Sequence, residues 1–478
     1  MKTNPLNQPF RMAAMGAMLI WVGVATFLIL FAGCNKKDFD KYATTQEEKS
    51  EIINRHKPNI ILIMGDDIGY EVPTCNGGQS YETPNIDWMA KNGMRFTQCH
   101  SSPFCAPSRW MLLTGKYNFR NFDHYGILGT DQRTIANMLH DNGYTTAVYG
   151  KWAMDGGETS ARIFGFDQYT IWNPYKDFEG DVQSKGSHYK DPQIYEDGKF
   201  VADSLTKGKF GDDIFTDSVL NFISNNKSTP FFAYYPMTLC HLPFTATPDD
   251  PEFATWKKGR GHDLHGGPDT VWYPNMIKYT DKLIGKIIQR VRDEGIAQKT
   301  AIIVIMGDNG GPFGITSYFN GQIVEGGRQS IKENGTHVPL FVYWPGTVAA
   351  GSVNQDLIDF TDFLPTIAGI ASLPRPVNYG PLDGVSFAPQ LFGAPGIPRK
   401  WIFDHYYPFP DSPNTQLYRW VQNKTYKLYD TVSSRHGGKF YNIVNDINEE
   451  NAISKSKITP EEQAIKNEFY DVLSKMHN

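Results

Sequence analysis

The sequence has few cysteines and little net charge, and each shortage excludes a class of protein. Five cysteines in 478 residues are too scattered to give a readable disulfide framework, although a Cys75–Cys99 pair is an alternative to free thiols. The net charge is only −5 and no basic tract occurs, which argues against a nucleic-acid partner. Long repeats and low-complexity segments are also absent. The 40% apolar content is enough for one large globular domain and a smaller one.

One long uncharged run, residues 12–33, follows Lys2 and Arg11 and ends in Leu30-Phe-Ala-Gly-Cys34. This arrangement resembles a bacterial lipoprotein signal. Cleavage after residues 1–33 and lipidation of Cys34 would anchor the chain to a membrane through a polar tether, residues 34–57. A retained transmembrane helix is the alternative, because the run is long enough to span a bilayer. We therefore expect an exported protein of the bacterial periplasm or cell surface that is lipid-anchored.

Two apolar runs, residues 59–64 and 300–306, are each followed by a glycine and paired oxygen-bearing side chains. Such runs are typical of central parallel strands, whose carboxyl ends form the ligand-binding edge of an open α/β sheet. The paired side chains offer only oxygen ligands, which suits Ca²⁺ before Mg²⁺ and argues against zinc. The predicted ligands are Asp66, Asp67, Asp308 and Asn309.

The segments between and after these runs alternate in character. Helical spacing or strand-like apolar runs predict helices near 134–142, 213–225, 273–294 and 361–370, and strands at 144–149, 230–236 and 338–344. This alternation of helices and strands predicts an α/β fold with a large mixed, mostly parallel sheet flanked by helices. Beyond a Pro/Gly-rich stretch, short aromatic runs and a helix at 460–476 predict a smaller C-terminal antiparallel sheet plus helix. We place the catalytic domain at 58–395 and the C-terminal subdomain at 396–478.

The chain is organised around the stretch from Ser102 to Lys116. Pro107 fits a first helical turn, and the apolar residues that follow predict a helix ending near Gly115. Cys105 would then lie over unpaired N–H groups at the helix start, a position that favours an anion. Arg109, one turn further, adds a charge and donors suited to tetrahedral oxyanions.

Cys105-Ala-Pro-Ser-Arg109 followed by Leu113-Thr-Gly115 resembles the signature of the type I, formylglycine-dependent sulfatases of the alkaline-phosphatase-like superfamily. The resemblance implies that a formylglycine-generating maturation enzyme converts Cys105 to Cα-formylglycine, whose hydrated form attacks sulfur. It also implies that the formylglycine and the four oxygen-bearing residues named above surround one Ca²⁺ ion. The family carries a C-terminal subdomain of the expected kind.

Further blocks resemble this family, with two departures. Lys151, in Gly150-Lys-Trp152, matches a lysine that contacts the sulfate, and His241 matches a histidine that faces the leaving oxygen and would be the general acid. Ala153 stands where the family commonly has a histidine thought to deprotonate the hydrated formylglycine. Arg328 stands where a second sulfate-binding lysine is expected, with Lys332 as the alternative if the register slips.

The predicted substrate is a sulfated mono- or oligosaccharide. Thr114-Gly-Lys-Tyr-Asn118 and Gly335-Thr-His-Val-Pro339 resemble carbohydrate-active branches of the family. Sugar-binding side chains are expected on three loops, which contain His124 (with Asp123 and Tyr125), Trp172 (with Asn173 and Tyr175) and His405 (with Tyr406 and Tyr407). The alternatives are a phosphomonoester or phosphonate hydrolase of the same superfamily, and a non-catalytic lipoprotein that binds sulfated glycans.

Overall fold

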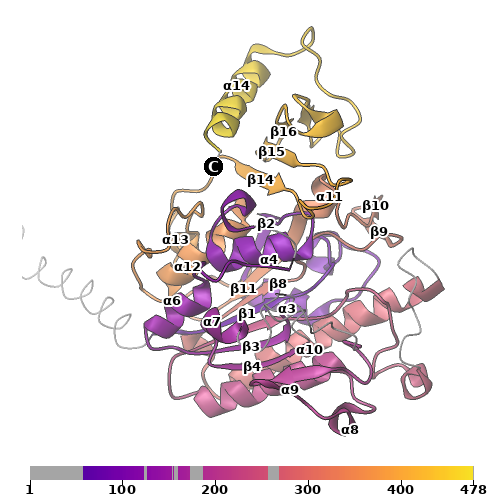
Figure 1. Ribbon diagram of the computed structural model, residues 1–478, viewed down its shortest axis with the longest axis vertical. Coiled ribbons are helices and arrows are strands. Elements are labelled where there is room, and N and C mark those ends of the chain that lie inside the picture. The colour runs from indigo at the N-terminus through magenta and orange to yellow at the C-terminus, as the bar shows by residue number, and fades with distance from the viewer. Residues whose placement is uncertain are drawn as a thin grey trace, which may run out of the picture. The chain divides into compact units, whose positions relative to one another are not determined.

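The computed structural model describes residues 57–122, 126–152, 154, 160–172, 187–256 and 268–476, and residues 58–478 form one compact unit (Figure 1). The predicted signal peptide, Cys34 and all but the last residue of the predicted tether lie outside the described residues. Within the described ranges, no helix is both long and apolar enough to cross a bilayer.

A mixed sheet of eleven strands forms the centre of the described unit. Its order is β12-β2-β11-β8-β1-β7-β3-β4-β5-β6, with β13 paired to β2. The five strands from β8 to β4 run parallel, while β11 enters antiparallel between β8 and β2. The predicted large, mostly parallel sheet is therefore confirmed. The strands are β1 (Asn59–Met64), β2 (Met94–His100), β3 (Thr145–Lys151), β4 (Gln168–Trp172), β5 (Ile194–Glu196), β6 (Lys199–Phe200), β7 (Phe231–Pro236), β8 (Thr300–Ile305), β11 (His337–Tyr343), β12 (Ser352–Asn354) and β13 (Ile358–Asp359).

Helices cover both faces of this sheet. Strand β1 shows why its sequence is apolar throughout: Ile60, Leu62 and Met64 join one core, whereas Ile61 and Ile63 join the other. The first core is covered by α4 (Cys105–Thr114), α6 (Ile135–Asp141) and α12 (Phe363–Ile370). The second is covered by α3 (Pro84–Asn92), α9 (Gly211–Asn226) and α10 (Tyr273–Asp293).

The predicted elements occur within a few residues of their expected bounds, but several elements were not predicted. Strand β2 alternates polar and apolar residues and lies antiparallel to β11, so it lacks the continuous apolar run that marks its neighbours. A short hairpin, β9 (Thr316–Phe319) and β10 (Gln322–Glu325), follows β8. The remaining short elements are helices α5 (Asn118–Asn121), α7 (Ser160–Ile163), α8 (Asp203–Thr206), α11 (Glu333–Thr336) and α13 (Ala388–Leu391), and 3₁₀ turns at Thr74–Asn76, Pro251–Thr255, Pro268–Trp272, Ala297–Lys299, Phe360–Asp362 and Ser434–His436.

A second, antiparallel sheet closes the chain, as predicted. It comprises β14 (Ile402–Tyr406), β15 (Tyr418–Gln422), β16 (Tyr426–Tyr429) and β17 (Phe440–Asn442) in that order. Helix α14 (Pro460–Lys475), yellow in Figure 1, packs on β15 and β16. It starts with a capping box between Thr459 and Glu462, which satisfies donors of its first turn. The domain boundary near residue 395 stays a prediction.

Candidate active site

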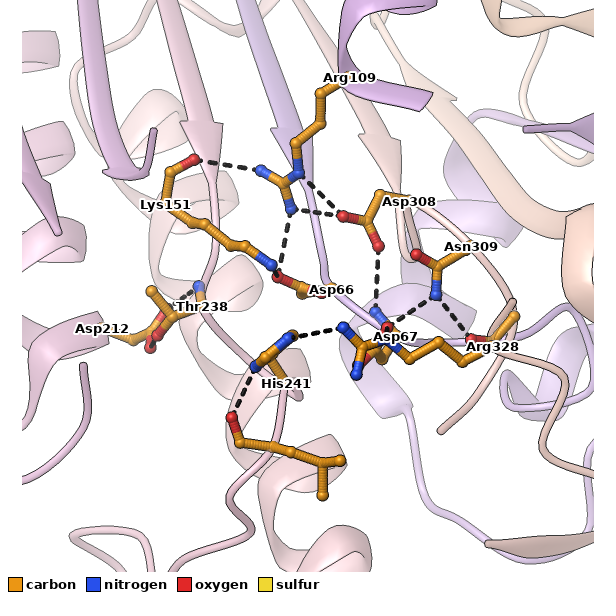
Figure 2. Close-up of polar contacts among 12 residues, drawn as sticks. Asp66, Asp67, Arg109, Lys151, Asp212, Thr238, His241, Asp308, Asn309 and Arg328 are labelled. Atoms are coloured by element: carbon orange, nitrogen blue, oxygen red, sulfur yellow. Dashed lines mark hydrogen bonds and ion pairs between the residues drawn. The ribbon is translucent and has the colours of Figure 1, made fainter. Parts of the chain in front are cut away.

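The acidic residues meet because β1 and β8 are hydrogen-bonded neighbours that end together, with Met64 opposite Ile305. The loops that follow bring Asp66, Asp67 and Asp308 to one place at the carboxyl edge of the sheet (Figure 2). The backbone N–H of Asp67 donates to Asp308 Oδ1 at 3.2 Å. The predicted juxtaposition of the two strand ends is therefore present.

Three oxygen atoms of this group have no hydrogen-bond partner among the described residues, although they are buried. They are Asp66 Oδ1, Asp67 Oδ2 and Asn309 Oδ1. A buried acceptor without a partner is costly, so three together fit the coordination of a cation. Carboxylate and amide oxygens are the ligands that Ca²⁺ prefers, and the residues present therefore fit a hard divalent cation.

A ring nitrogen of His241 also lies within 4.8 Å of the ligand atoms of Asp66 and Asp67. Both of its ring nitrogens have other partners, however. Nδ1 lies 2.6 Å from the carbonyl oxygen of Leu242, and Nε2 lies 3.0 Å from Arg328 Nη2. Because a carbonyl only accepts and a guanidinium only donates, His241 is the neutral tautomer with its proton on Nδ1. We therefore assign the cation ligands to the oxygens.

Arg109, on helix α4, holds the carboxylates of Asp308 and Asp66 in position. Its Nε and Nη2 donate to Asp308 Oδ2 at 2.9 and 2.7 Å, Nη2 also to Asp66 Oδ2 at 3.3 Å, and Nη1 to the carbonyl of Lys151 at 3.1 Å. Burial alone would lower the pKa of Arg109, but the carboxylates of Asp308 and Asp66 outweigh it and raise the pKa. The sequence suggested that Arg109 adds donors for a substrate oxyanion, whereas in the structure its donors are directed at the protein's own carboxylates.

Lys151 ends strand β3 and pairs with Asp66 Oδ2. Burial tends to lower the pKa of Lys151, but Asp66 and then Cys105 raise it above the usual value, so the amine is charged. Burial, followed by the nearby Asp308, raises the pKa of Asp66 to about 7. The acidic side chains at this edge of the sheet are Asp66, Asp67 and Asp308. They form ion pairs with three cationic side chains, those of Lys151, Arg109 and Arg328.

Arg328 and His241 form the opposite side of the site. Arg328 Nε lies 3.2 Å from Asp67 Oδ1, in addition to its contact with His241. These contacts favour Arg328 over Lys332 as the residue that faces the site. Burial lowers the pKa of His241 well below its ordinary value, and the charges of Lys151 and Arg328 lower it further. The resting histidine is thus neutral.

Cys105 is the first residue of α4, which runs to Thr114 and stops at Gly115 in a left-handed conformation. The side chain of Ser108 fixes this start, because its hydroxyl donates to the carbonyl of Ser102 at 2.8 Å and accepts from the Ser102 N–H at 3.1 Å. Cys105 is 1% exposed. Arg109, one turn further along the same helix, donates to Asp308 and Asp66, which brings the start of α4 to the acidic group.

Of the residues predicted to bind sugar, four lie in the described part of the chain: Trp172, His405, Tyr406 and Tyr407. His124, with Asp123 and Tyr125, lies outside the described residues, as do Asn173, Tyr175 and the departure at Ala153. Trp172 ends β4 and is half-buried. On β14, Tyr406 packs in one cluster with Phe104 and Cys105, while the ring of His405 lies 6.0 Å from Phe119. Strand alternation thus places Tyr406 beside the candidate nucleophile and His405 on the other side. The role of His405 in sugar binding stays a prediction.

Two residues next to the site, His188 and Asp212, were not predicted from the sequence. The ring of His188 lies 4.6 Å from Trp172 and 5.9 Å from His241, between centroids. Asp212, fully buried at the start of α9, accepts from the N–H of Thr238 at 3.1 Å and from its hydroxyl (Figure 2). Asp212 therefore holds the turn between β7 and His241. In the sequence it looked like an ordinary acidic residue of a first helical turn.

The fold, the oxygen-rich sheet edge and the cysteine at a helix start define a hydrolase of the alkaline-phosphatase-like class. Comparison with known families agrees with this. The Sulfatase family matches residues 58–373, and the family described as N-sulphoglucosamine sulphohydrolase, C-terminal, matches residues 327–478. The chain belongs to the sulfatase family, and it is a sulfuric ester hydrolase.

The chain is similar to several named sulfatases. Arylsulfatase G of Rattus norvegicus is 27% identical over 393 residues, which cover 73% of this chain and 71% of that protein. N-acetylglucosamine-6-O-sulfatase of Bacteroides thetaiotaomicron is 24% identical, over 86% of this chain and 84% of that protein. Among solved structures, Ps i-CgsB is 25% identical with a TM-score of 0.71, over 88% of this chain and 92% of that one. A protein solved with its substrate D-glucosamine-2-N,6-O-disulfate is 23% identical with a TM-score of 0.67, over 88% and 97%, and shows the same fold.

Proposed function

We propose that the protein hydrolyses sulfate esters of mono- or oligosaccharides, with a formylglycine derived from Cys105 as the nucleophile and one bound Ca²⁺. The observation that carries this proposal is the group of three buried, unpartnered oxygens at the sheet edge that Arg109, one turn beyond Cys105, contacts. Asp66, Asp67 and Asn309 supply them, and Asp308 completes the ligand set. Zinc is disfavoured because both nitrogens of the nearest histidine are already engaged.

The charges of the site support binding of a sulfate ester. Three acidic and three cationic side chains meet here, so a bound divalent cation would add positive charge that attracts an anion. When bound, Ca²⁺ acts as a Lewis acid that polarises a sulfate oxygen, and formylglycine supplies a hydroxyl nucleophile in its hydrated form. Lys151 and Arg328 neutralise the remaining sulfate oxygens. Arg109 holds Asp308 and Asp66 in position.

His241 is the proposed general acid for the leaving oxygen. The resting ring is neutral and accepts from Arg328 at Nε2. When a sulfate anion binds, Arg328 can donate to it, and the negative charge raises the pKa of His241. Protonation at Nε2 then leaves a donor directed into the site, while Nδ1–H remains bound to the carbonyl of Leu242.

We expect His241→Ala to slow sugar sulfates by at least about a hundred-fold while affecting activated aryl sulfates little, because only a poor leaving group needs the proton. The measurement is kcat/KM across a series of sulfate esters whose leaving groups differ in pKa. His140→Ala is the matched control, because this histidine lies half-exposed on α6. An equal loss for both substrate types would remove the acid role.

A carbohydrate substrate is supported by the site's surroundings and by the relatives. Two relatives are named for activity on amino sugars, N-acetylgalactosamine-6-sulfatase of Mus musculus and the N-acetylglucosamine-6-O-sulfatase already described. Trp172 is half-buried and lies next to His188, whereas Tyr406 is buried beside Cys105 and offers no free face. An aromatic face like that of Trp172 stacks on sugar rings. We place the scissile sulfate at the end of a saccharide chain, because buried residues close the site behind it.

The test is a panel of sulfated galactose, N-acetylhexosamine, fucose and uronate-containing oligosaccharides, with an aryl sulfate and matched phosphate esters. We expect at least one sugar sulfate to be turned over with a kcat/KM well above that of its phosphate counterpart. Rapid hydrolysis of the aryl sulfate with every sugar inert would defeat the carbohydrate proposal. Faster hydrolysis of the phosphates would assign the site to phosphoryl transfer instead.

The proposed cellular setting rests on the sequence alone. We propose that the chain is exported, meets a formylglycine-generating maturation enzyme, and is retained at a membrane by a lipid on Cys34. We also propose a catalytic domain at 58–395 with a C-terminal subdomain at 396–478. Mass spectrometry of the N-terminal peptide of the wild-type protein tests the anchor, and a peptide that continues uncleaved through Cys34, or a Cys34 without acyl chains, would rule it out.

A further inference from the structure

Residues 327–336, here called the Arg328 loop, connect the β9–β10 hairpin to strand β11. The site side of the loop is fixed by two backbone bonds. The N–H of Arg328 donates to the carbonyl of Gly311 at 2.8 Å, and the N–H of Gln329 donates to that of Pro103, also at 2.8 Å. Gly311 follows the cation ligands and Pro103 precedes Cys105, so this side of the loop is tied to the catalytic groups.

The far side of the loop is held by the C-terminal sheet. The carbonyl of Ile331 accepts from Lys427 Nζ, and the hydroxyl of Tyr429 lies 3.3 Å from the same oxygen. Lys427 Nζ also pairs with Glu449 Oε1 at 3.0 Å, and Tyr429 donates to Glu449 Oε2. A further bond joins Gln422 Nε2 to Glu333 Oε1 at 2.6 Å. The carbonyl oxygen of Ile331 is thus contacted by Lys427 and Tyr429, which lie 96 and 98 positions further along the chain.

Stability does not account for this network. Lys427 and Glu449 are both fully buried, and taking two charges out of water costs about as much as their attraction returns. Replacement of such a pair by uncharged side chains of similar size is often neutral for stability. Burial and the neighbouring Glu449 raise the pKa of Tyr429 well above its ordinary value, so its hydroxyl remains a donor. What the network does achieve is to fix the position of the Ile331 carbonyl.

We propose that Lys427, Tyr429 and Glu449 are positioning residues for Arg328. By fixing the loop three residues beyond Arg328, they set the guanidinium against Asp67 and His241, where it meets the sulfate. This inference rests on the proposed function, because the role of Arg328 in sulfate binding does. It makes the C-terminal sheet part of the sulfate site, although none of these three residues touches the substrate.

The test is the double variant Lys427→Met with Glu449→Gln, which removes both charges and the contact to Ile331 at similar volume. We expect KM for a sulfate ester to rise on the order of ten-fold, the effect of one lost charge-assisted hydrogen bond, with a smaller change in kcat. Amide hydrogen exchange across residues 327–336 should become faster. The melting temperature should change little, because exchange of a buried ion pair for uncharged side chains of similar size is often neutral for stability.

A double-mutant cycle with Arg328→Ala separates positioning from a general effect. If the network acts through Arg328, removing it from the Arg328→Ala protein costs nothing further. If the network substitutions weaken sulfate binding in the Arg328→Ala protein as much as in the wild type, the proposal is wrong. The same cycle, measured by calorimetry with inorganic sulfate, needs no turnover. A wild-type protein that binds sulfate and shows the coupling but cleaves no sulfate ester would contradict the proposed function and leave the positioning role intact.

Two further variants serve as controls. Arg419→Met with Asp430→Asn removes another ion pair of the same sheet, 3.0 Å long, whose arginine donates to the carbonyl of Leu473 in α14 and not to the loop. An equal rise in KM in this control would overturn the proposal, because it would indicate general loosening of the sheet. Tyr429→Phe is the milder test if the first double variant does not fold. It should raise KM about two- to three-fold, and an unchanged KM with unchanged exchange would also count against the network.

Discussion

Cys105→Ala should abolish sulfate ester hydrolysis and leave the fold intact. Alanine is the residue that helices accept best, and Cys105 is the first residue of α4. The lost side-chain atom leaves a space of about one methyl group next to Phe104 and Tyr406, which costs on the order of 1 kcal/mol. Removal of a catalytic nucleophile, in contrast, reduces turnover by about a million-fold.

The measurement combines kcat with the mass of the peptide that contains Cys105. In protein from a host with the maturation machinery, this peptide should carry an aldehyde in place of the thiol. Cys105→Ser should also be inactive unless the host oxidises serine. Cys99→Ala is the matched control, because Cys99 is equally buried but lies in strand β2. A fully active alanine variant at position 105 would contradict the assignment of this residue as the nucleophile.

The sheet and its catalytic edge were predictable because their signals are local. Two continuous apolar runs, each followed by glycine and an acidic residue, specify two buried parallel strands that end in polar loops. Their adjacency then brings Asp66 and Asp308 together. The helix at Cys105 was predictable for the same reason, since Pro107 and Gly115 mark its start and end within the segment itself.

The interactions that organise the site were not predictable, because they join residues distant in sequence. Arg109 donates to Asp308, 199 positions away, and this pairing decides that the guanidinium braces ligands. Lys427 reaches Ile331 over 96 positions. His188 gives no local pattern at all, and its place between Trp172 and His241 follows only from the packing of β4 and the turn after β7. Side-chain roles of this kind depend on tertiary contacts rather than on spacing.

Asp67→Asn should weaken Ca²⁺ binding by about a hundred-fold or more and remove activity in proportion, since affinity in oxygen sites follows the number of charged ligands. The substitution preserves the backbone, because Asp67 has a φ of 56°, a left-handed conformation that asparagine also tolerates. Asn309 Nδ2 donates to Asp67 Oδ1 at 2.7 Å, and the amide oxygen of the new side chain can keep this bond. Its NH₂ group then occupies the place of the unpartnered Oδ2, where it presents donor hydrogens to the cation.

The loss is measured on protein stripped by a chelator, by calorimetric titration and by thermal unfolding with added Ca²⁺. A ligand at a hundred times its Kd stabilises the folded state by about 2.7 kcal/mol, so wild-type protein should melt at a higher temperature with Ca²⁺, and Asp67→Asn should not. Asp249→Asn is the control, because this half-exposed carboxylate pairs with Lys282 at the surface. Wild-type affinity for Ca²⁺ in the Asp67 variant, or zinc found in the purified enzyme, would contradict the oxygen-ligand assignment. Because the unpartnered oxygens belong to Asp66 and Asn309 as well, the residual affinity of the variant would show how far those two residues hold the cation without Asp67.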